Sequence, residues 1–372
     1  MINRIPVAKP VIGDEEINAV AEVLKSGYYT SGPRVKAFEE AYAEYVGTDH
    51  ARGVSSGTSA IYLTLQGLGI GPGDEVIVPA MTFFSTATSV LRVGATPIFA
   101  DINLSTYNLS SHDVLKKITD KTKAIIPVHF YGLPADMDEF NKIGTAHDVY
   151  IIEDAAQAHG AMYKGKKAGS LGDAGCWSFF ATKNMTCACE AGMVTTNNED
   201  LASKISVLRS HGMCDRNTHA MLGYNDRMDE VAGAVGLVQL RKLDTFNELR
   251  IDNSMYLRRK LRDVPWLQPP PLFRDRTHVF FWANFKVNEE VLGMSVDELR
   301  TSLWDRGMGT RHRYNAPLYK QPALNQFLHL HRYDKDYCPN AENMAGKMIG
   351  LPNYPGLTQN ELERVVDIIK ET

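Results

Sequence analysis

Residues 76–100 read VIVPAMTFFSTATSVLRVGATPIFA, and this stretch decides the fold. Its apolar ends predict buried strands over 75–79 and 96–101. The segment 85–93 between them predicts a helix, followed by a turn at Gly94. A strand, a helix and a second strand in this order are typical of parallel sheets, whereas two prolines, an arginine and several hydroxyl groups argue against a membrane span.

The same alternation extends over residues 50–245. Strands are also predicted at 123–129, 149–154, 175–180 and 192–196, and helices at 59–68, 137–147 and 200–209. Apolar strands separated by helices indicate a mostly parallel sheet that is covered on both faces. The last two strands have only a short connection, so an antiparallel hairpin is predicted there.

The C-terminal third has a different pattern. A polar helix over 247–262 is followed by an aromatic strand over 279–287 and an amphipathic helix over 295–306. With 372 residues, the chain is too long for one simple core. We predict an N-terminal segment and large α/β domain over residues 1–245 and a small α+β domain over 246–372.

Composition narrows the class of protein. Hydrophobic residues make up 44% and charged residues 23%, as in soluble globular proteins. The net charge of −4 gives no general electrostatic basis for binding nucleic acid. The N-terminus lacks the apolar core of a signal peptide, and five cysteines without a disulfide framework predict a reduced, cytoplasmic setting. The pairs Cys187/Cys189 and His329/His331 lack partners at ligand spacing, so no metal is expected.

Lys183 stands out in the segment WSFFATKNMT, residues 177–186. It follows an apolar strand, and burial of its amine would lower the pKa and make it a nucleophile that forms Schiff bases with carbonyl groups. The hydroxyl of Ser178 would lie near the amine if the strand bends. The simpler interpretation is a loop lysine that extends into solvent.

Asp154 ends the predicted strand 149–154, where ligands bind in open α/β sheets. The competing interpretation is a cap for the residues that follow. Glu153 points to the opposite side of the strand and is expected to be structural.

The turn 53–59, GVSSGTS, opens a helix and is typical of a phosphate site, although Ser56 or Thr58 could simply cap the helix. It also matches the G-x-S-x-G pattern of serine hydrolases, with Ser55 as nucleophile. Such an enzyme requires a buried strand before the nucleophile. However, residues 50–53 are a poor match for a buried strand. The hydrolase remains an alternative.

Together these parts match the needs of pyridoxal 5′-phosphate (PLP). Its phosphate requires a helix N-terminus, its pyridine nitrogen a carboxylate, and its aldehyde a lysine. Phe83 or Phe84 follows the strand 75–79 and could cover the ring.

The segments SSGT (55–58), IEDAAQAHG (152–160), SFFATKN (178–184) and GYNDRM (223–228) resemble the DegT-type nucleotide-sugar aminotransferase family of fold type I PLP enzymes. The resemblance covers nearly the whole chain. It implies that Lys183 forms the Schiff base and moves the substrate proton, while Asp154 bonds the pyridine nitrogen. The other implied cofactor contacts are Gln157 at the ring hydroxyl, Phe83 at the ring face, and Gly57, Thr58 and Ser178 at the phosphate.

The resemblance also implies a homodimer with shared active sites, because Asn225 lies in a loop that crosses to the partner's phosphate in relatives. Judged by sequence alone, Asn225 would be a turn residue. The implied amino donor is L-glutamate, whose carboxylate requires an arginine. The candidate substrate-binding residues are Tyr29, Arg227, Arg311, Arg313 and Tyr314.

Three departures from the family pattern concern substrate binding. The loop from Cys187 to Ala191 is one residue longer than usual and has alanine at a common glycine position, and Asp226 and Tyr319 replace common residues. We predict a PLP-dependent aminotransferase acting on a nucleotide-linked keto-deoxysugar. The alternatives are a PLP-binding regulatory protein and the serine hydrolase.

Overall fold

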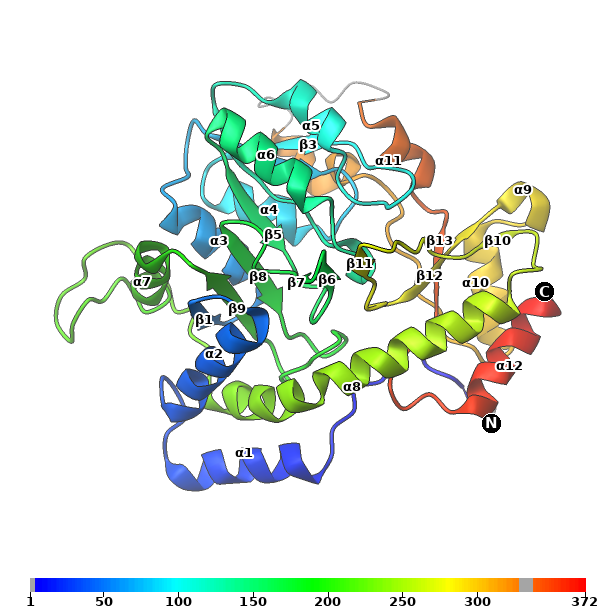
Figure 1. Cartoon of the computed structure of the whole chain (residues 1–372), viewed down its shortest axis with the longest axis horizontal. Coiled ribbons are helices and arrows are strands. Elements are labelled where there is room, and N and C mark those ends of the chain that lie inside the picture. The colour runs from blue at the N-terminus through cyan, green and yellow to red at the C-terminus, as the bar shows by residue number, and fades with distance from the viewer. Residues whose placement is uncertain (1–3, 328–336) are drawn as a thin grey trace.

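In a computed structural model that describes residues 4–327 and 337–372, a seven-stranded sheet forms the centre of the molecule (Figure 1). Its strand order is β1-β9-β8-β5-β4-β2-β3. The strands are β1 (His50–Val54), β2 (Glu75–Pro79), β3 (Thr96–Ala100), β4 (Thr122–Ile125), β5 (Tyr150–Asp154), β8 (Ala174–Ser178) and β9 (Gly192–Thr196). Strand β9 is antiparallel to both of its neighbours, and the other neighbouring pairs are parallel. The predicted α/β class and the hairpin between β8 and β9 are thereby confirmed.

Helices cover both faces of this sheet. They are α2 (Pro33–Val46), α3 (Gly57–Gly67), α4 (Ser85–Arg92), α5 (Ser111–Lys117), α6 (Met137–His147), α7 (Glu199–Leu208) and α8 (Glu230–Lys260), while α1 (Asp14–Ser26) packs against α8. Successive side chains of a strand point to opposite faces. Accordingly, Val76 and Val78 belong to a core with α3, α4 and α7, while Ile77 belongs to a second core with α5 and α6.

Residues 50–53, a poor match for a buried strand, form part of β1, in which His50 and Arg52 are only half-buried. Among the strands of the described residues, β1 pairs with β9 alone, so it lies at an edge of the sheet. Ala51 and Val54 are buried, whereas Arg52 is half-buried and donates from Nε to Ser206 Oγ at 2.8 Å. An edge strand accommodates such a charged side chain, which a central strand would not.

The C-terminal part contains the sheet β10-β12-β13. Its elements are β10 (Leu267–Gln268), β12 (Ala283–Val287), α9 (Glu289–Leu292), α10 (Val296–Asp305), α11 (Pro339–Met344), β13 (Met348–Leu351) and α12 (Gln359–Lys370). A small sheet of β6 (Met162–Tyr163), β7 (Lys166–Lys167) and β11 (Arg276–Thr277) completes the strands. Figure 1 shows that the long helix α8 runs from the large sheet to the C-terminal part. Because α8 is continuous across residue 245, the division at that position stays a prediction.

The aromatic strand predicted over 279–287 is wrong in its first half. The strand β12 begins only at Ala283. Before it, Val279 N and Phe281 N donate to the carbonyl oxygens of Gly132 and Tyr131, and Phe280 has a φ of 45°. These backbone groups bind a loop of the large sheet, so residues 279–282 connect the two parts of the molecule.

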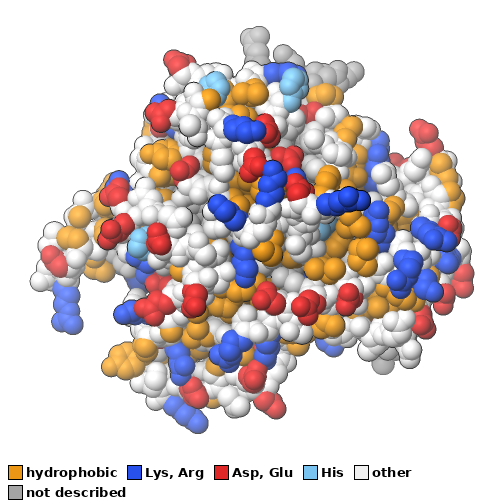
Figure 2. Space-filling model, viewed as in Figure 1, with side chains coloured by type: hydrophobic (Ala, Val, Ile, Leu, Met, Phe, Trp, Pro, Cys, Tyr) orange, Lys and Arg blue, Asp and Glu red, His pale blue; other side chains and the backbone are white. Residues whose placement is uncertain are grey.

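The surface carries charges of both signs. On the face shown in Figure 2, basic and acidic side chains are interspersed over the helices and the C-terminal part. Among the helices within residues 4–327 and 337–372, none combines the length and hydropathy needed to cross a bilayer.

Candidate active site

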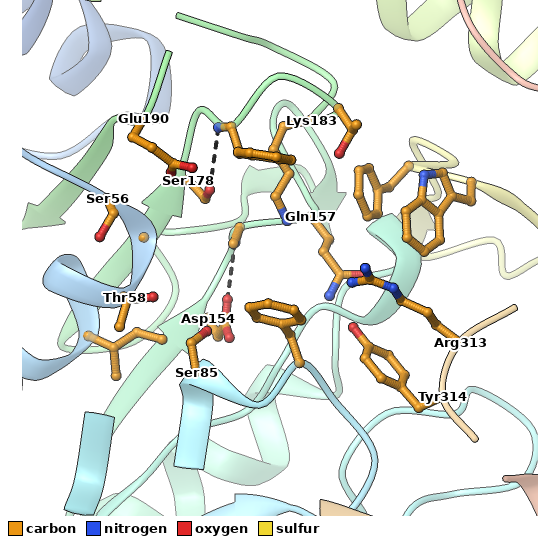
Figure 3. A pocket seen from close by; sticks show the side chains of 18 of the residues that line it. Ser56, Thr58, Ser85, Asp154, Gln157, Ser178, Lys183, Glu190, Arg313 and Tyr314 are labelled. Carbon is orange, nitrogen blue, oxygen red and sulfur yellow. Dashed lines mark hydrogen bonds between the residues drawn. The ribbon is translucent and has the colours of Figure 1, made fainter. Parts of the chain in front are cut away.

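A cavity of about 350 Å³ opens where β5 and β8 end and α3 and α4 begin. This volume lies within the range of small-molecule sites. Ten of the predicted site residues line it: Gly57, Thr58, Phe83, Asp154, Gln157, Ser178, Lys183, Arg311, Arg313 and Tyr314. In Figure 3, Ser56 and Thr58 lie at one side of the cavity, Arg313 and Tyr314 lie at the other, and Gln157 lies between them.

Lys183 lies on the loop that follows β8, and its amide donates to Phe180 O at 2.9 Å. Its Nζ is 4.6 Å from the ring centroid of Phe281. Burial lowers the pKa of Lys183 to about 8, the nearby carboxylate of Asp154 opposes this shift, and the charge of Arg313 adds to it. The amine is therefore neutral in a larger fraction of molecules than an ordinary lysine at neutral pH, in agreement with the sequence prediction.

Asp154 is the last residue of β5 and is 4% exposed. Its Oδ2 accepts a hydrogen bond from Thr86 Oγ1 at 2.8 Å, and its Oδ1 accepts one from Ala156 N at 3.3 Å. Burial raises the pKa of this carboxyl group, while the hydrogen bond from Thr86 and the charge of Lys183 lower it. The bond to Ala156 is the capping contact considered above, but the carboxylate also lines the cavity.

Glu153 points away from the cavity, as predicted. Its carboxylate accepts hydrogen bonds from His129 Nε2 at 2.7 Å and from three backbone amides, those of Gly169, Leu171 and Gly172, at 2.7 to 2.8 Å. Glu153, His129 and Gly169 are buried and Leu171 and Gly172 are half-buried, so Glu153 holds the 169–172 turn against the sheet.

The helix α3 begins at the cavity. Ser56 caps it by accepting a hydrogen bond from Ser59 N at 3.1 Å. The amides of Gly57 and Thr58 have no hydrogen-bond partner among the described residues, and both residues line the cavity. A Cβ atom at Gly57 would lie 2.7 Å from Ser178 Cβ, so only glycine lets the start of α3 approach this serine. Free N–H groups at a helix N-terminus attract anions.

The opposite side of the cavity is cationic. Arg313 Cζ lies 5.6 Å from the ring centroid of Phe83, and Arg311 Cζ lies 4.9 Å from that of Trp282. Neither arginine forms a salt bridge within residues 4–327 and 337–372. Burial and the charge of Arg313 lower the pKa of Arg311. Two cations without counter-ions favour an anionic ligand here.

Three predicted residues lie outside this cavity. The side chain of Tyr29 is 54% exposed, and its hydroxyl donates to Leu24 O at 3.4 Å. Asn225 is exposed and forms an antiparallel bridge with Ser210, and Arg227 forms one with Val54. Within one chain, the structure does not bring them to the other site residues.

The unusual loop beside Lys183 packs under the end of β8. Phe179 N donates to Ala191 O at 2.9 Å, and Cys187 N donates to Phe179 O at 3.0 Å. Ala191 is buried and has no positive φ, so alanine is accommodated there without backbone strain, whereas Ala188 has a φ of 62°. From this loop only Glu190 lines the cavity.

The hydrolase alternative finds no support. Ser55 Oγ donates to Asp226 Oδ1 at 2.7 Å and lies 2.8 Å from Ser59 Oγ. It does not line the cavity, and none of the partners that the structure records for this hydroxyl is a histidine. A serine nucleophile requires such a base.

Phe281, Trp282 and Glu190 also line the cavity, and the sequence interpretation missed them. Residues 281 and 282 were assigned to a strand of the small domain, and their approach to Lys183 depends on a long-range contact that leaves no local signal. The one sequence feature that could have indicated a role for them is that Phe281 and Trp282 are adjacent aromatic residues.

A sequence profile of the DegT/DnrJ/EryC1/StrS aminotransferase family matches residues 10–370. The chain belongs to this family. Among curated relatives, it is 36% identical to the spore coat polysaccharide biosynthesis protein SpsC of Bacillus subtilis (strain 168), with 99% of this chain and 96% of SpsC covered. It is 38% identical to a pleiotropic regulatory protein of Geobacillus stearothermophilus, with 96% and 94% covered.

Solved structures with significant similarity to this chain have the same fold. DesV of S. venezuelae superposes with a TM-score of 0.90 at 36% identity, over 96% of this chain and 94% of DesV. Spr1654 of Streptococcus pneumoniae in its PLP form superposes with a TM-score of 0.90 at 28% identity, over 99% of this chain and 98% of Spr1654. The chain is thus a sugar aminotransferase of fold type I.

Membership of this aminotransferase family implies PLP, and the cavity residues fit it. Free amides at Gly57 and Thr58 suit a phosphate, the buried carboxylate of Asp154 suits a protonated ring nitrogen, and Lys183 has the lowered pKa that a Schiff base requires. Within the described residues, no group of three or more His, Cys, Asp and Glu side chains is arranged to hold a metal ion. His329 and His331 lie outside the described residues.

Proposed function

We propose that this aminotransferase uses PLP to move an amino group from L-glutamate to a keto group on a nucleotide-linked deoxysugar. The observation that supports this proposal most strongly is a single cavity that combines a lysine with a lowered pKa, a buried carboxylate and a helix N-terminus. PLP, when bound, would supply a pyridinium ring that withdraws electrons from the carbon bearing the amine.

In this proposal, Lys183 would bind the aldehyde of the cofactor and then move a proton at the substrate carbon. A pKa near 8 suits a group that must both take up and release a proton near neutral pH. Asp154 would remain ionised and keep a proton on the pyridine nitrogen. The other cofactor contacts would be Gln157 at the ring hydroxyl, Phe83 at the ring face, and Gly57, Thr58 and Ser178 at the phosphate.

Arg311 and Arg313, with Tyr314, would bind the carboxylates of the amino donor, because guanidinium groups bind carboxylates in a bidentate manner. Arg313 and Tyr314 lie on the side of the cavity away from the helix N-terminus, which leaves that end for phosphate (Figure 3). Asn225 would reach the phosphate of the partner subunit in a homodimer with shared active sites. Tyr29 and Arg227 would contribute to substrate binding from the same interface.

A second candidate function is a regulatory protein that binds PLP without turnover. The name of the Geobacillus stearothermophilus relative favours it. The lowered pKa of Lys183 and the two unpaired arginines favour turnover instead, because a purely regulatory site has no need of a nucleophile and a donor site.

Absorbance spectroscopy tests the proposal. The purified protein is expected to be yellow, to lose the visible band on addition of L-glutamate, and to regain it with one member of a panel of nucleotide-linked keto-sugars. Lys183→Ala should abolish turnover, and Lys320→Ala, a substitution outside the cavity, should leave the spectrum unchanged. A yellow protein whose visible band L-glutamate leaves unchanged would favour the regulatory function, and a colourless protein that binds no added PLP would refute both.

A further inference from the structure

One face of the helix α4 touches two separate parts of the candidate active site. Thr86 donates from Oγ1 to Asp154 Oδ2 at 2.8 Å, and Ser89 donates from Oγ to Thr58 O at 3.3 Å. Residues three apart lie on the same face of a helix. The helix that follows β2 therefore connects the buried carboxylate with the start of α3.

The environment of Thr86 ties its hydroxyl to Asp154. Thr86 is 0% exposed, and its neighbours on the inner face, Ala87 and Val90, are buried apolar residues. A buried hydroxyl destabilises the folded state unless it forms a hydrogen bond. Among the described residues the hydroxyl has one recorded partner, the carboxylate of Asp154.

The carboxylate of Asp154 needs such a partner. Burial disfavours its ionised form, and a hydrogen bond donated to a carboxylate favours it. The other titratable groups that act on Asp154 or respond to its charge are Lys183, His129, Tyr314 and Cys176. His129 is engaged with Glu153 and with Ala135 N, and Cys176 is a buried thiol, so neither donates to Asp154.

We propose that Thr86 is a positioning residue that keeps Asp154 ionised and directed into the cavity. Thr86 does not line the cavity and would touch neither cofactor nor substrate. The inference rests on the proposed function, because it takes Asp154 as the partner of the pyridine nitrogen. The first turn of α4 thereby helps to set the protonation state of Asp154.

The test is the affinity of the apoprotein for PLP, measured by fluorescence titration from pH 5 to 9. Thr86→Val keeps the shape and removes the donor. Without the donor, the pKa of Asp154 rises, so Asp154 takes up its proton at a higher pH than in the wild type. As pH falls, binding that depends on its charge is therefore lost earlier than in the wild type. We expect affinity at pH 7 to fall about tenfold, and the acid limb of binding to move up by about one pH unit. Thr86→Ser should restore both.

Thr88→Val is the matched control, because Thr88 lies on the same helix, outside the cavity, and its hydroxyl only approaches Ser85 O, at 3.5 Å. It should bind PLP like the wild type. An unchanged acid limb in Thr86→Val would overturn the inference, even if thermal unfolding shows that the variant is less stable. A wild-type protein that binds no PLP, or Asp154→Asn binding as tightly as the wild type, would instead overturn the proposed function and the inference with it.

Discussion

At the scale of the residue, the burial of each charged group determines its pKa and therefore its reactivity. Lys183 and Asp154 are neighbours in space, and burial acts on both: it lowers the pKa of the lysine and raises that of the aspartate. Each charge stabilises the other, which limits both shifts. This pairing keeps a nucleophile and a carboxylate available at the same pH.

The lysine gives a pH prediction. Its folded pKa of about 8 lies below that of an exposed lysine, so its neutral form increases as pH rises through 8. The apoprotein should therefore react with pyridoxal, which lacks the phosphate, faster at pH 9 than at pH 7, with a midpoint near 8. Stopped-flow absorbance measures this rate, and Lys183→Ala supplies the background. A rate that continues to rise up to pH 10 would indicate an unperturbed lysine.

The residues with strong local patterns were those that the sequence made predictable. Asp154 at the end of an apolar strand, Lys183 after another strand and Gly57 at the start of a helix all line the cavity. Thr86 and Trp282 were not predictable, because their roles depend on contacts between segments far apart in the chain. The hydrogen bond from Thr86 to Asp154 spans 68 positions of sequence.

At the scale of the element, the start of α3 is defined by close packing. The carbonyl oxygen of Ser56 would lie 2.3 Å from a Cβ atom at Gly192, and Gly57 meets Ser178 in the same way. Two glycines on different elements thus allow the helix N-terminus to reach the ends of β8 and β9. The sequence predicted the helix, but the approach of these strands required the structure.

Gly57→Ala tests this packing. The new Cβ atom would lie 2.7 Å from Ser178 Cβ, so the helix start must move and its free amides lose their alignment. We expect affinity for PLP to fall at least about tenfold, equivalent to about 1.4 kcal/mol. Equilibrium titration of the apoprotein measures it. Gly13→Ala is the control, because the nearest atom to its Cβ lies 3.7 Å away and its φ is −134°. Equal affinity in the two variants would contradict the proposed phosphate site.

At the scale of the whole molecule, the active site joins two parts of the chain. Strand ends and helix starts from the large sheet supply Lys183, Asp154 and the phosphate end, while residues 281–282 and 311–314 bring aromatic and cationic side chains from the C-terminal part. The order of strands and helices could be predicted because each element has its own regular spacing of apolar residues in the sequence. The strand predicted over 279–287 is wrong in its first half because Val279 and Phe281 bind the loop at Tyr131 and Gly132 instead of a neighbouring strand.

The central claim is that PLP is held by this chain on Lys183. Borohydride reduction of the PLP-loaded protein, followed by peptide mass spectrometry, tests it most directly. Reduction makes a lysine–PLP linkage permanent, so we expect one modified peptide, which carries the added mass on Lys183, and none in Lys183→Ala. Modification of another lysine, or no modified peptide from a protein shown to bind PLP, would contradict it.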